Sequence, residues 1–196
     1  MSQLIIAISR EYGSGGHEIG KMLAEHFQLD FYDHNLLDEM FGLEHVEKKG
    51  LRMFEEVPKF GLTRTVRGMS SSPEHNLSEK QFEYIENMAK EGRSFVICGR
   101  CAESILKDYK GMISFFVLGD YECKLNRIMQ RRNMNGKEAA LAISRHDKKR
   151  KAYHNYYCDG KWGDSRLYDL SINSSRLGIN GTANLLINYI KQLRNL

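Results

Sequence analysis

Short apolar runs recur along the chain, and longer stretches with helical periodicity separate them. The first run covers residues 4–8 and is apolar without alternation, as expected for a strand buried on both faces of a parallel sheet. Four further strands are predicted over residues 29–33, 94–98, 112–118 and 168–173. Apolar residues at spacings of three and four predict helices around residues 17–27, 82–89, 121–129 and 183–190, the third of them capped by Asp120.

This alternation predicts an α/β fold in which a doubly wound parallel sheet carries helices on both faces. Sheets of this kind bind their ligands beyond the carboxyl ends of the strands. Two stretches break the alternation. Residues 44–75 hold both prolines and a run of three serines, and residues 131–163 are basic and partly helical. We expect both to be mobile insertions that act as lids on a single domain spanning residues 1–196.

A glycine-rich turn joins the first strand to the first helix. It comprises Gly13, Ser14, Gly15, Gly16, His17 and Glu18. Its glycines allow positive φ angles and close backbone approach, and the first N–H groups of the helix point into the turn, so we predict a phosphate-binding loop. The pattern G-x-x-x-x-G-K-[ST] is not met, because alignment on Gly16 puts His17 at the lysine and Glu18 at the hydroxyl position. An ordinary strand-to-helix turn is the alternative interpretation.

The charge of the chain is unevenly distributed. The net charge is +4. Residues 124–151, however, contain ten Lys or Arg against Glu138 and Asp147, a net +8 that leaves −4 for the remainder. A basic segment in an otherwise acidic protein indicates an anionic ligand or nucleic acid, with a solvated helix face as the alternative.

Hydrophobic runs and cysteines narrow the class of protein further. No apolar run approaches the ~20 residues that span a membrane, and no signal-peptide pattern opens the chain, so we expect a cytoplasmic protein without membrane contact. Cys98 and Cys101 are the only closely spaced pair among four cysteines. We interpret them as buried thiols at a strand end rather than a redox pair. A zinc site is not predicted, because no second ligand pair has suitable spacing.

Several segments together resemble the cytidylate kinase-like proteins, which are relatives of the nucleoside monophosphate kinases. The matching segments are ISREYGSGGHEI (8–19), FYDH (31–34), VICGRCA (96–102), RHDKKR (145–150), KWGD (161–164) and YDLSINSSRLGI (168–179). The resemblance implies a five-stranded sheet of order 2-3-1-4-5. It also implies an acceptor-binding lobe in the first insertion and a phosphate-clamping lid in the second.

The resemblance also implies roles for individual residues. The backbone from Gly13 to Glu18 would hold the β-phosphate of ATP, while Mg²⁺ is held largely by water and phosphate with no protein ligand predicted. The acceptor phosphate would meet Arg100 and Asp33. The residues predicted to act on the transferring group are His17, Arg131, Arg132, Arg145 and Arg150.

Two departures from the family pattern bear on activity. His17 replaces the loop lysine and is mostly neutral at pH 7 unless phosphate raises its pKa. Cys101 stands where cytidylate kinases carry aspartate. The leading hypothesis is a phosphotransferase that moves the γ-phosphoryl group of ATP, with Mg²⁺, to CMP or a similar phosphorylated acceptor. The alternatives are a nucleotide-binding regulator without transfer activity and a nucleic-acid binder that uses residues 124–151. The sequence specifies no oligomeric state.

Overall fold

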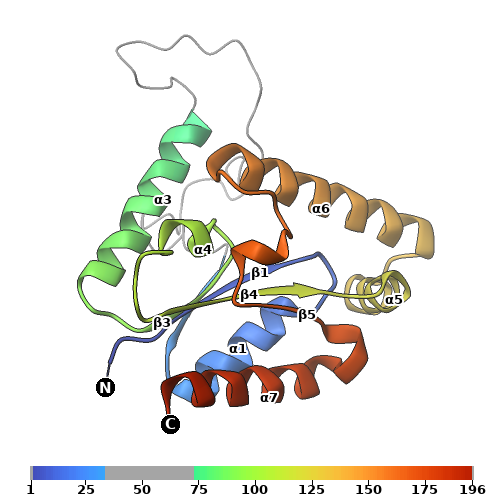
Figure 1. Ribbon diagram of the computed structural model, residues 1–196. Coiled ribbons are helices and arrows are strands. Elements are labelled where there is room, and N and C mark those ends of the chain that lie inside the picture. The colour runs from blue at the N-terminus through green and yellow to red at the C-terminus, as the bar shows by residue number, and fades with distance from the viewer. Residues whose placement is uncertain (1, 34–72, 196) are drawn as a thin grey trace.

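A computed structural model describes residues 2–33 and 73–195. Its centre is a five-stranded, all-parallel sheet of order β2-β3-β1-β4-β5, which confirms the predicted fold class and strand order (Figure 1). The strands are β1 (Ile5–Arg10), β2 (Asp30–Tyr32), β3 (Phe95–Cys98), β4 (Met112–Leu118) and β5 (Leu170–Asn173). The helices are α1 (Gly16–Phe27), α3 (Pro73–Lys90), α4 (Ala102–Ile105), α5 (Tyr121–Arg132), α6 (Gly136–Tyr157) and α7 (Ser174–Arg194).

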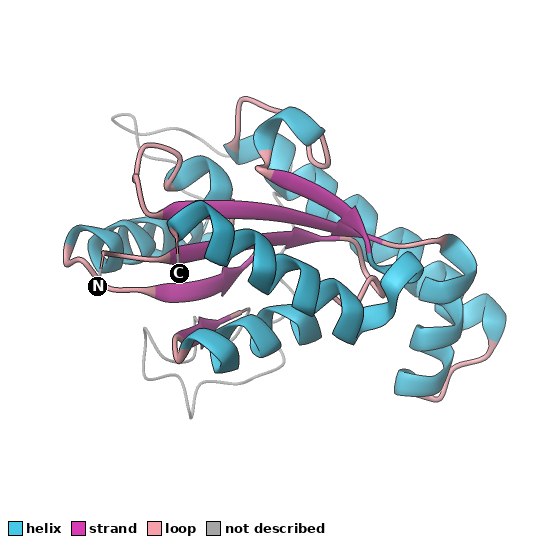
Figure 2. Cartoon of the chain, turned by 60° about the horizontal axis from the view of Figure 1, so that its bottom comes forward, coloured by secondary structure: helices cyan, strands magenta, loops and turns pink. Residues whose placement is uncertain are grey.

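Alternate residues of each strand point to opposite faces of the sheet and so build two separate cores. In β1, Ile6 and Ile8 pack with apolar residues of α1 and α7, whereas Ile5 and Ala7 pack with those of α3 and α4. Figure 2 shows the sheet between these two layers of helices. Burial on both faces explains why the strands read as unbroken apolar runs in the sequence.

Helices α5 and α6 pack against each other at one end of the sheet. Ile128 of α5 and Ala139 and Ile143 of α6 form a third apolar cluster, and Tyr12 of the glycine-rich turn packs against it. This cluster holds α6 next to the loop that follows β1. The two helices therefore position the basic segment beside the carboxyl ends of the strands.

The structure refines several boundaries. Arg131 and Arg132 belong to the end of α5, and most of the second predicted insertion is the single helix α6. Asp120 occupies the N-cap position of α5, but the prediction that its side chain caps the helix is wrong, because its carboxylate accepts a hydrogen bond from Asn173 Nδ2 (2.7 Å). Nearly all of the predicted insertion 44–75 lies outside the described residues. No described helix is long and apolar enough to cross a membrane.

Candidate functional site

The turn between β1 and α1 has the backbone geometry of an anion-binding loop. Gly13 and Gly15 both have φ of +83°, a conformation that favours glycine. Ser14 is buried and its hydroxyl donates to the Glu11 carbonyl oxygen (2.8 Å). A Cβ on Gly16 would lie 2.6 Å from Arg10 Cβ, so only glycine fits where α1 begins beside β1. The loop thus places the first N–H groups of α1 around one point.

His17 lies in the first turn of α1 and is paired with the predicted acceptor residue Asp33. His17 Nδ1 is 3.3 Å from Asp33 Oδ2, and Phe31 packs against the imidazole ring at a centroid distance of 5.2 Å. Burial lowers the pKa of His17 and outweighs the opposing effect of the Asp33 carboxylate, so the pKa is below its usual value of 6.5. Without a ligand, His17 is therefore predominantly neutral at pH 7.

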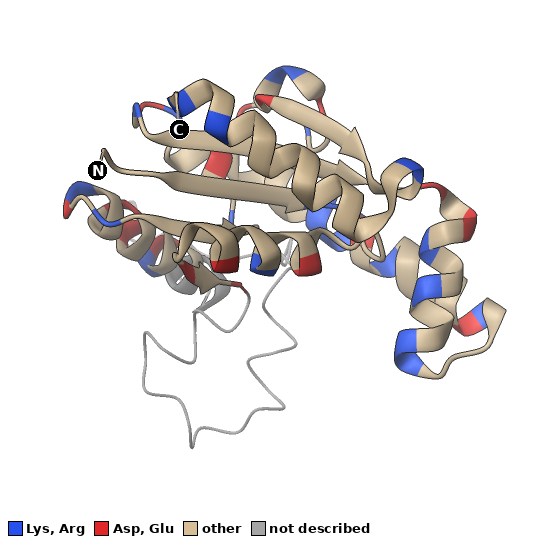
Figure 3. Cartoon of the chain, turned by 90° about the horizontal axis from the view of Figure 1, so that it is seen from below, with Lys and Arg blue, Asp and Glu red and all other residues tan. Residues whose placement is uncertain are grey.

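Cationic side chains surround a cavity of about 280 Å³ next to the loop. They come from β1, α1, α5 and α6 and are Arg10, Lys21, Arg127, Arg131, Arg132 and Arg150. Figure 3 shows Lys and Arg gathered on the helices at this end of the sheet. Six cations facing one cavity would strongly favour a polyanionic ligand.

Three of these arginines are fixed by contacts with the loop or with the strand that leads into it. Arg127 donates a hydrogen bond to the Gly13 carbonyl oxygen, and Arg131 Nη1 is 2.5 Å from Glu18 Oε1. Arg150 donates to the Arg10 carbonyl oxygen (3.2 Å) and lies over the Tyr12 ring. The guanidinium groups are thus already positioned around the cavity.

A partly buried ionic network holds the loop to α5 and α6. Lys124 Nζ lies 2.8 Å from Glu11 Oε2 and 3.6 Å from Asp147 Oδ2. The Tyr12 N–H donates to Asp147 Oδ1 (2.6 Å), and the Gly119 N–H donates to Glu11 Oε2 (3.2 Å). Burial raises the pKa of Asp147, while the Tyr12 N–H opposes that shift. These contacts fix the loop without using its own N–H groups from Gly15 onward.

The other predicted acceptor residue, Arg100, borders a smaller cavity of about 40 Å³ after β3. Gly99, Arg100 and Cys101 have φ of +92°, +61° and +55°, so the chain leaves β3 through three left-handed residues. Arg10 and Arg150 line both cavities. The structure thus places Asp33 in the larger cavity and Arg100 in an adjoining one.

The predicted lid residues do not all lie together. Arg131, Arg132 and Arg150 line the larger cavity, whereas Arg145 is exposed and lines neither cavity. Sequence reasoning did not single out Arg127, although Lys124, Arg127 and Arg131 are spaced by three and four residues. That spacing puts all three on one face of a helix and could have identified Arg127.

The larger cavity also contains groups that suit Mg²⁺. Three carboxylates border it, those of Glu11, Glu18 and Asp33. Mg²⁺ is generally bound by one or two carboxylates together with phosphate oxygens and water. Glu11 is held by buried Lys124, so Glu18 and Asp33 are the more available pair. These residues therefore fit a magnesium–nucleotide complex.

Comparison with known proteins agrees with this geometry. The sequence model of the cytidylate kinase-like family matches residues 5–176. The chain belongs to this family. Cytidylate kinases from Methanococcus maripaludis strains C5 and S2 are each 30% identical to it over 164 residues, which is 81% of this chain and 89% of each relative. Family membership confirms the resemblance and supports a nucleotide kinase-like function.

Solved structures extend the comparison to the fold of the family. An uncharacterised protein from Eubacterium ventriosum is 38% identical with a TM-score of 0.77, and the match covers 96% of this chain and 99% of that one. The shikimate kinase from Bacteroides thetaiotaomicron has a TM-score of 0.57 at 14% identity, covering 98% and 99% of the two chains. At that identity the similarity shows a shared kinase fold alone.

Proposed function

We propose that this protein transfers the γ-phosphoryl group of ATP to CMP or a similar small phosphorylated acceptor. The observation that carries the proposal is the glycine loop opening onto a cavity lined by six cations. The acceptor is already an oxyanion, so one of its phosphate oxygens attacks the γ-phosphorus without a general base. The bond from that phosphorus to the bridging oxygen breaks, and its electron pair stays on ADP.

The described residues would act by positioning and by neutralising charge. The loop N–H groups from Gly15 to Glu18 hold the phosphates of the donor. Arg127 and Arg131 approach from α5, and Arg150 approaches from α6. Guanidinium groups match phosphate oxygens in bidentate geometry, so these three can follow the charge as it moves toward the leaving oxygen.

Mg²⁺ bound with ATP would neutralise part of the phosphate charge, with Glu18 and Asp33 as the protein groups able to hold it. Asp33 also faces His17, so a cation near Asp33 competes with the imidazole for the carboxylate. Arg100 in the adjoining cavity is our candidate for the acceptor phosphate.

A second candidate function is nucleotide binding without transfer. The neutral state of His17 favours it, because the loop lysine that normally accompanies phosphate transfer is absent. The nucleic-acid alternative is less supported. Lys124, Arg127 and Arg131 engage the loop and its flanking residues instead of forming one continuous outward basic face.

A transfer assay with a matched pair of variants tests the proposal. ADP formation from ATP in the presence of Mg²⁺ is measured with CMP, dCMP, UMP and AMP in turn as the acceptor. The binding of each nucleotide is measured by calorimetry. We expect Arg150→Met to lower kcat at least ~100-fold, as for loss of a preorganised charge at a transferring group. Its exposed neighbour in α6 serves as the control, with Lys151→Met expected to match the parent. Tight binding without transfer would favour the second candidate, and no nucleotide binding would overturn both.

A further inference from the structure

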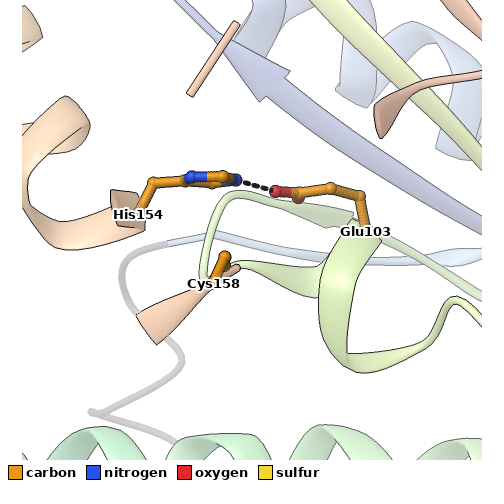
Figure 4. A group of neighbouring side chains, drawn as sticks. All are labelled: Glu103, His154 and Cys158. Atoms are coloured by element: carbon orange, nitrogen blue, oxygen red, sulfur yellow. Dashed lines mark hydrogen bonds and ion pairs between the residues drawn. The ribbon is translucent and has the colours of Figure 1, made fainter. Parts of the chain in front are cut away.

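A buried cluster of titratable side chains lies away from the glycine loop and is not used by the proposed function. Cys101 is the N-cap residue of α4, and Cys158 is the C-cap residue of α6. Glu103 and His154, both less than 5% exposed, lie beside Cys158 (Figure 4). The cluster therefore joins the turn after β3 to the end of the long helix that carries Arg150.

The two cysteines of this cluster are neighbours that interact electrostatically. The thiol of Cys101 and the sulfur of Cys158 affect each other's pKa, although 57 residues separate them along the chain. The sequence predicts that Cys98 and Cys101 are buried thiols rather than a redox pair, and both are buried, with Cys98 packed in the core against α1 and α7. Tertiary structure thus gives Cys101 a partner that is distant in the sequence.

The remaining groups form a chain of hydrogen bonds that supports a negative charge on Cys158. Ser9 Oγ donates to Glu103 Oε2 (3.0 Å), and His154 Nε2 lies 2.8 Å from Glu103 Oε1. The Cys158 sulfur, a ring nitrogen of His154 and a carboxylate oxygen of Glu103 all lie within 4.8 Å of one another. This arrangement of thiolate, imidazolium and carboxylate is the one that activates a cysteine as a nucleophile.

The electrostatics agree with the geometry. Burial alone would lower the pKa of His154, but the neighbouring Cys158 and Glu103 raise it to about 10. The effects of the neighbouring Cys101 and His154 outweigh that of burial and lower the Cys158 pKa to about 6. The neighbouring Cys158 and burial raise the pKa of Cys101, so the proton stays on that thiol.

We propose that Cys158 and Cys101 form an oxidisable thiol pair that a hydroperoxide converts into a disulfide. Cys158 is half-buried, whereas Cys101 is buried and borders the 40 Å³ cavity together with His154. Cys98 is also buried and borders the same cavity, but burial raises the pKa of its thiol, and Cys123 is exposed on α5 outside the cluster. Cys158 is therefore the thiol that combines access with an activating neighbour.

The chemistry balances within the cluster. The Cys158 thiolate attacks one peroxide oxygen, the O–O bond breaks, and His154 gives its proton to the departing hydroxide, so water and a sulfenic acid form. The Cys101 sulfur then attacks the Cys158 sulfur. The proton of the Cys101 thiol passes to the sulfenic hydroxyl, which leaves as a second water. The net reaction oxidises two thiols to one disulfide and reduces one peroxide to two waters.

The new bond would fix the end of α6 to the turn that carries Arg100. Because Arg150 lies two turns before Cys158 on the same helix, the bond would limit how far α6 can move relative to the phosphate cavity. This consequence rests on the proposed function. The oxidation itself does not, so its failure would leave the proposed transfer activity unaffected.

A metal ion is the competing explanation for the same side chains. One ligand atom each from Glu103, His154 and Cys158 lies within 4.8 Å of the others. A metal-bound histidine usually donates its second ring N–H to an acceptor. Among the described residues, His154 Nδ1 is buried with no hydrogen-bond partner, which disfavours a metal.

Peptide mapping of the full-length protein tests the proposal. The reduced protein is treated with a small excess of hydrogen peroxide, alkylated and digested without reductant. We expect a Cys101–Cys158 peptide that has lost two hydrogens, in both the parent and the control variant Cys123→Ser. In Cys101→Ser, Cys158 should stop as a sulfenic acid that dimedone traps. His154→Gln should slow disulfide formation at least ~10-fold, because the thiolate loses its cationic neighbour.

Two results would overturn the proposal. One is preferential oxidation of Cys123 or Cys98 with Cys158 left reduced. The other is one equivalent of zinc in the purified protein, with Cys158 protected from peroxide until a chelator is added. The second result would assign the cluster as a metal site. Sulfenic acid formation at Cys158 is measured in Cys101→Ser, so the test does not depend on whether a Cys158→Ser variant folds.

Discussion

Glu18 offers a sharp test of the phosphate cavity, because it is a carboxylate in a place built for anions. It follows His17 in the first turn of α1, and its Oε1 lies 2.5 Å from Arg131 Nη1. The side chains are 34% and 51% exposed, respectively. A triphosphate must therefore draw Arg131 away from Glu18 before that guanidinium can contact phosphate.

The structure sets the size of the effect expected for Glu18→Gln. Ion pairs with this exposure typically contribute ~0.2–1 kcal/mol. Releasing Arg131 from that pair should tighten binding of metal-free ATP by between ~1.4-fold and ~5-fold, because the same free energy no longer opposes the exchange of partners. Loss of like-charge repulsion between the carboxylate and the phosphates acts in the same direction.

Calorimetric titration of ATP with and without Mg²⁺ separates the two possible roles of Glu18. Glu25 lies on the exposed part of the same helix and outside the cavity, so Glu25→Gln is the matched control and should leave both affinities unchanged. If Glu18 holds Mg²⁺, Glu18→Gln will tighten ATP alone but weaken Mg²⁺–ATP. Weaker binding of metal-free ATP in this variant would refute the account of Glu18 as a competitor for Arg131.

Three further predictions concern other groups. The His17 pKa is lowered in the free protein and should rise beside phosphate. ATP affinity should therefore increase as the pH falls from the bound-state pKa to the free-state pKa, by at most tenfold per pH unit. In calorimetric titrations, His17→Lys should flatten this pH dependence. Arg127→Met removes the donor to the Gly13 carbonyl and should weaken ATP about tenfold in the same assay. Glu103→Gln breaks a buried pair and should lower the free energy of unfolding in urea by about 3 kcal/mol, whereas the exposed Glu86→Gln should change it little.

The fold could be predicted because parallel strands leave a strong local signal. Five apolar runs separated by helical patterns gave every strand of the sheet to within two residues at each end. The glycine loop was equally local, since turn, strand and helix start lie within fifteen residues. The side chains that contact the loop, however, lie far from it in the sequence. The contacts of Arg131 with Glu18 and of Lys124 with Glu11 both span 113 residues of sequence.

The orientation of α6 could have been predicted from the spacing of its apolar residues. Ile143 is buried against α5, and Arg150 lies seven residues later, so it shares that face of the helix. Arg145 follows Ile143 by two residues and points to the opposite side, where it is exposed. From composition alone, Arg145 and Arg150 were equivalent members of one basic segment. Only the packing face separates the residue that lines the cavity from the one that does not.

The cations around the loop differ in how easily a ligand can recruit them. Lys124 is buried and paired with both Glu11 and Asp147, so removing it from those carboxylates would leave charges uncompensated in a poorly solvated place. Arg131 has one carboxylate partner in the structure's ion pairs and is half-exposed, so it can exchange that partner for phosphate at small cost. Lys124 therefore fixes the conformation of the loop, whereas the half-exposed Arg131 can rearrange to contact the ligand. In a loop whose own lysine position is a histidine that is neutral without a ligand, Arg131 of α5 therefore supplies part of the charge that responds to phosphate.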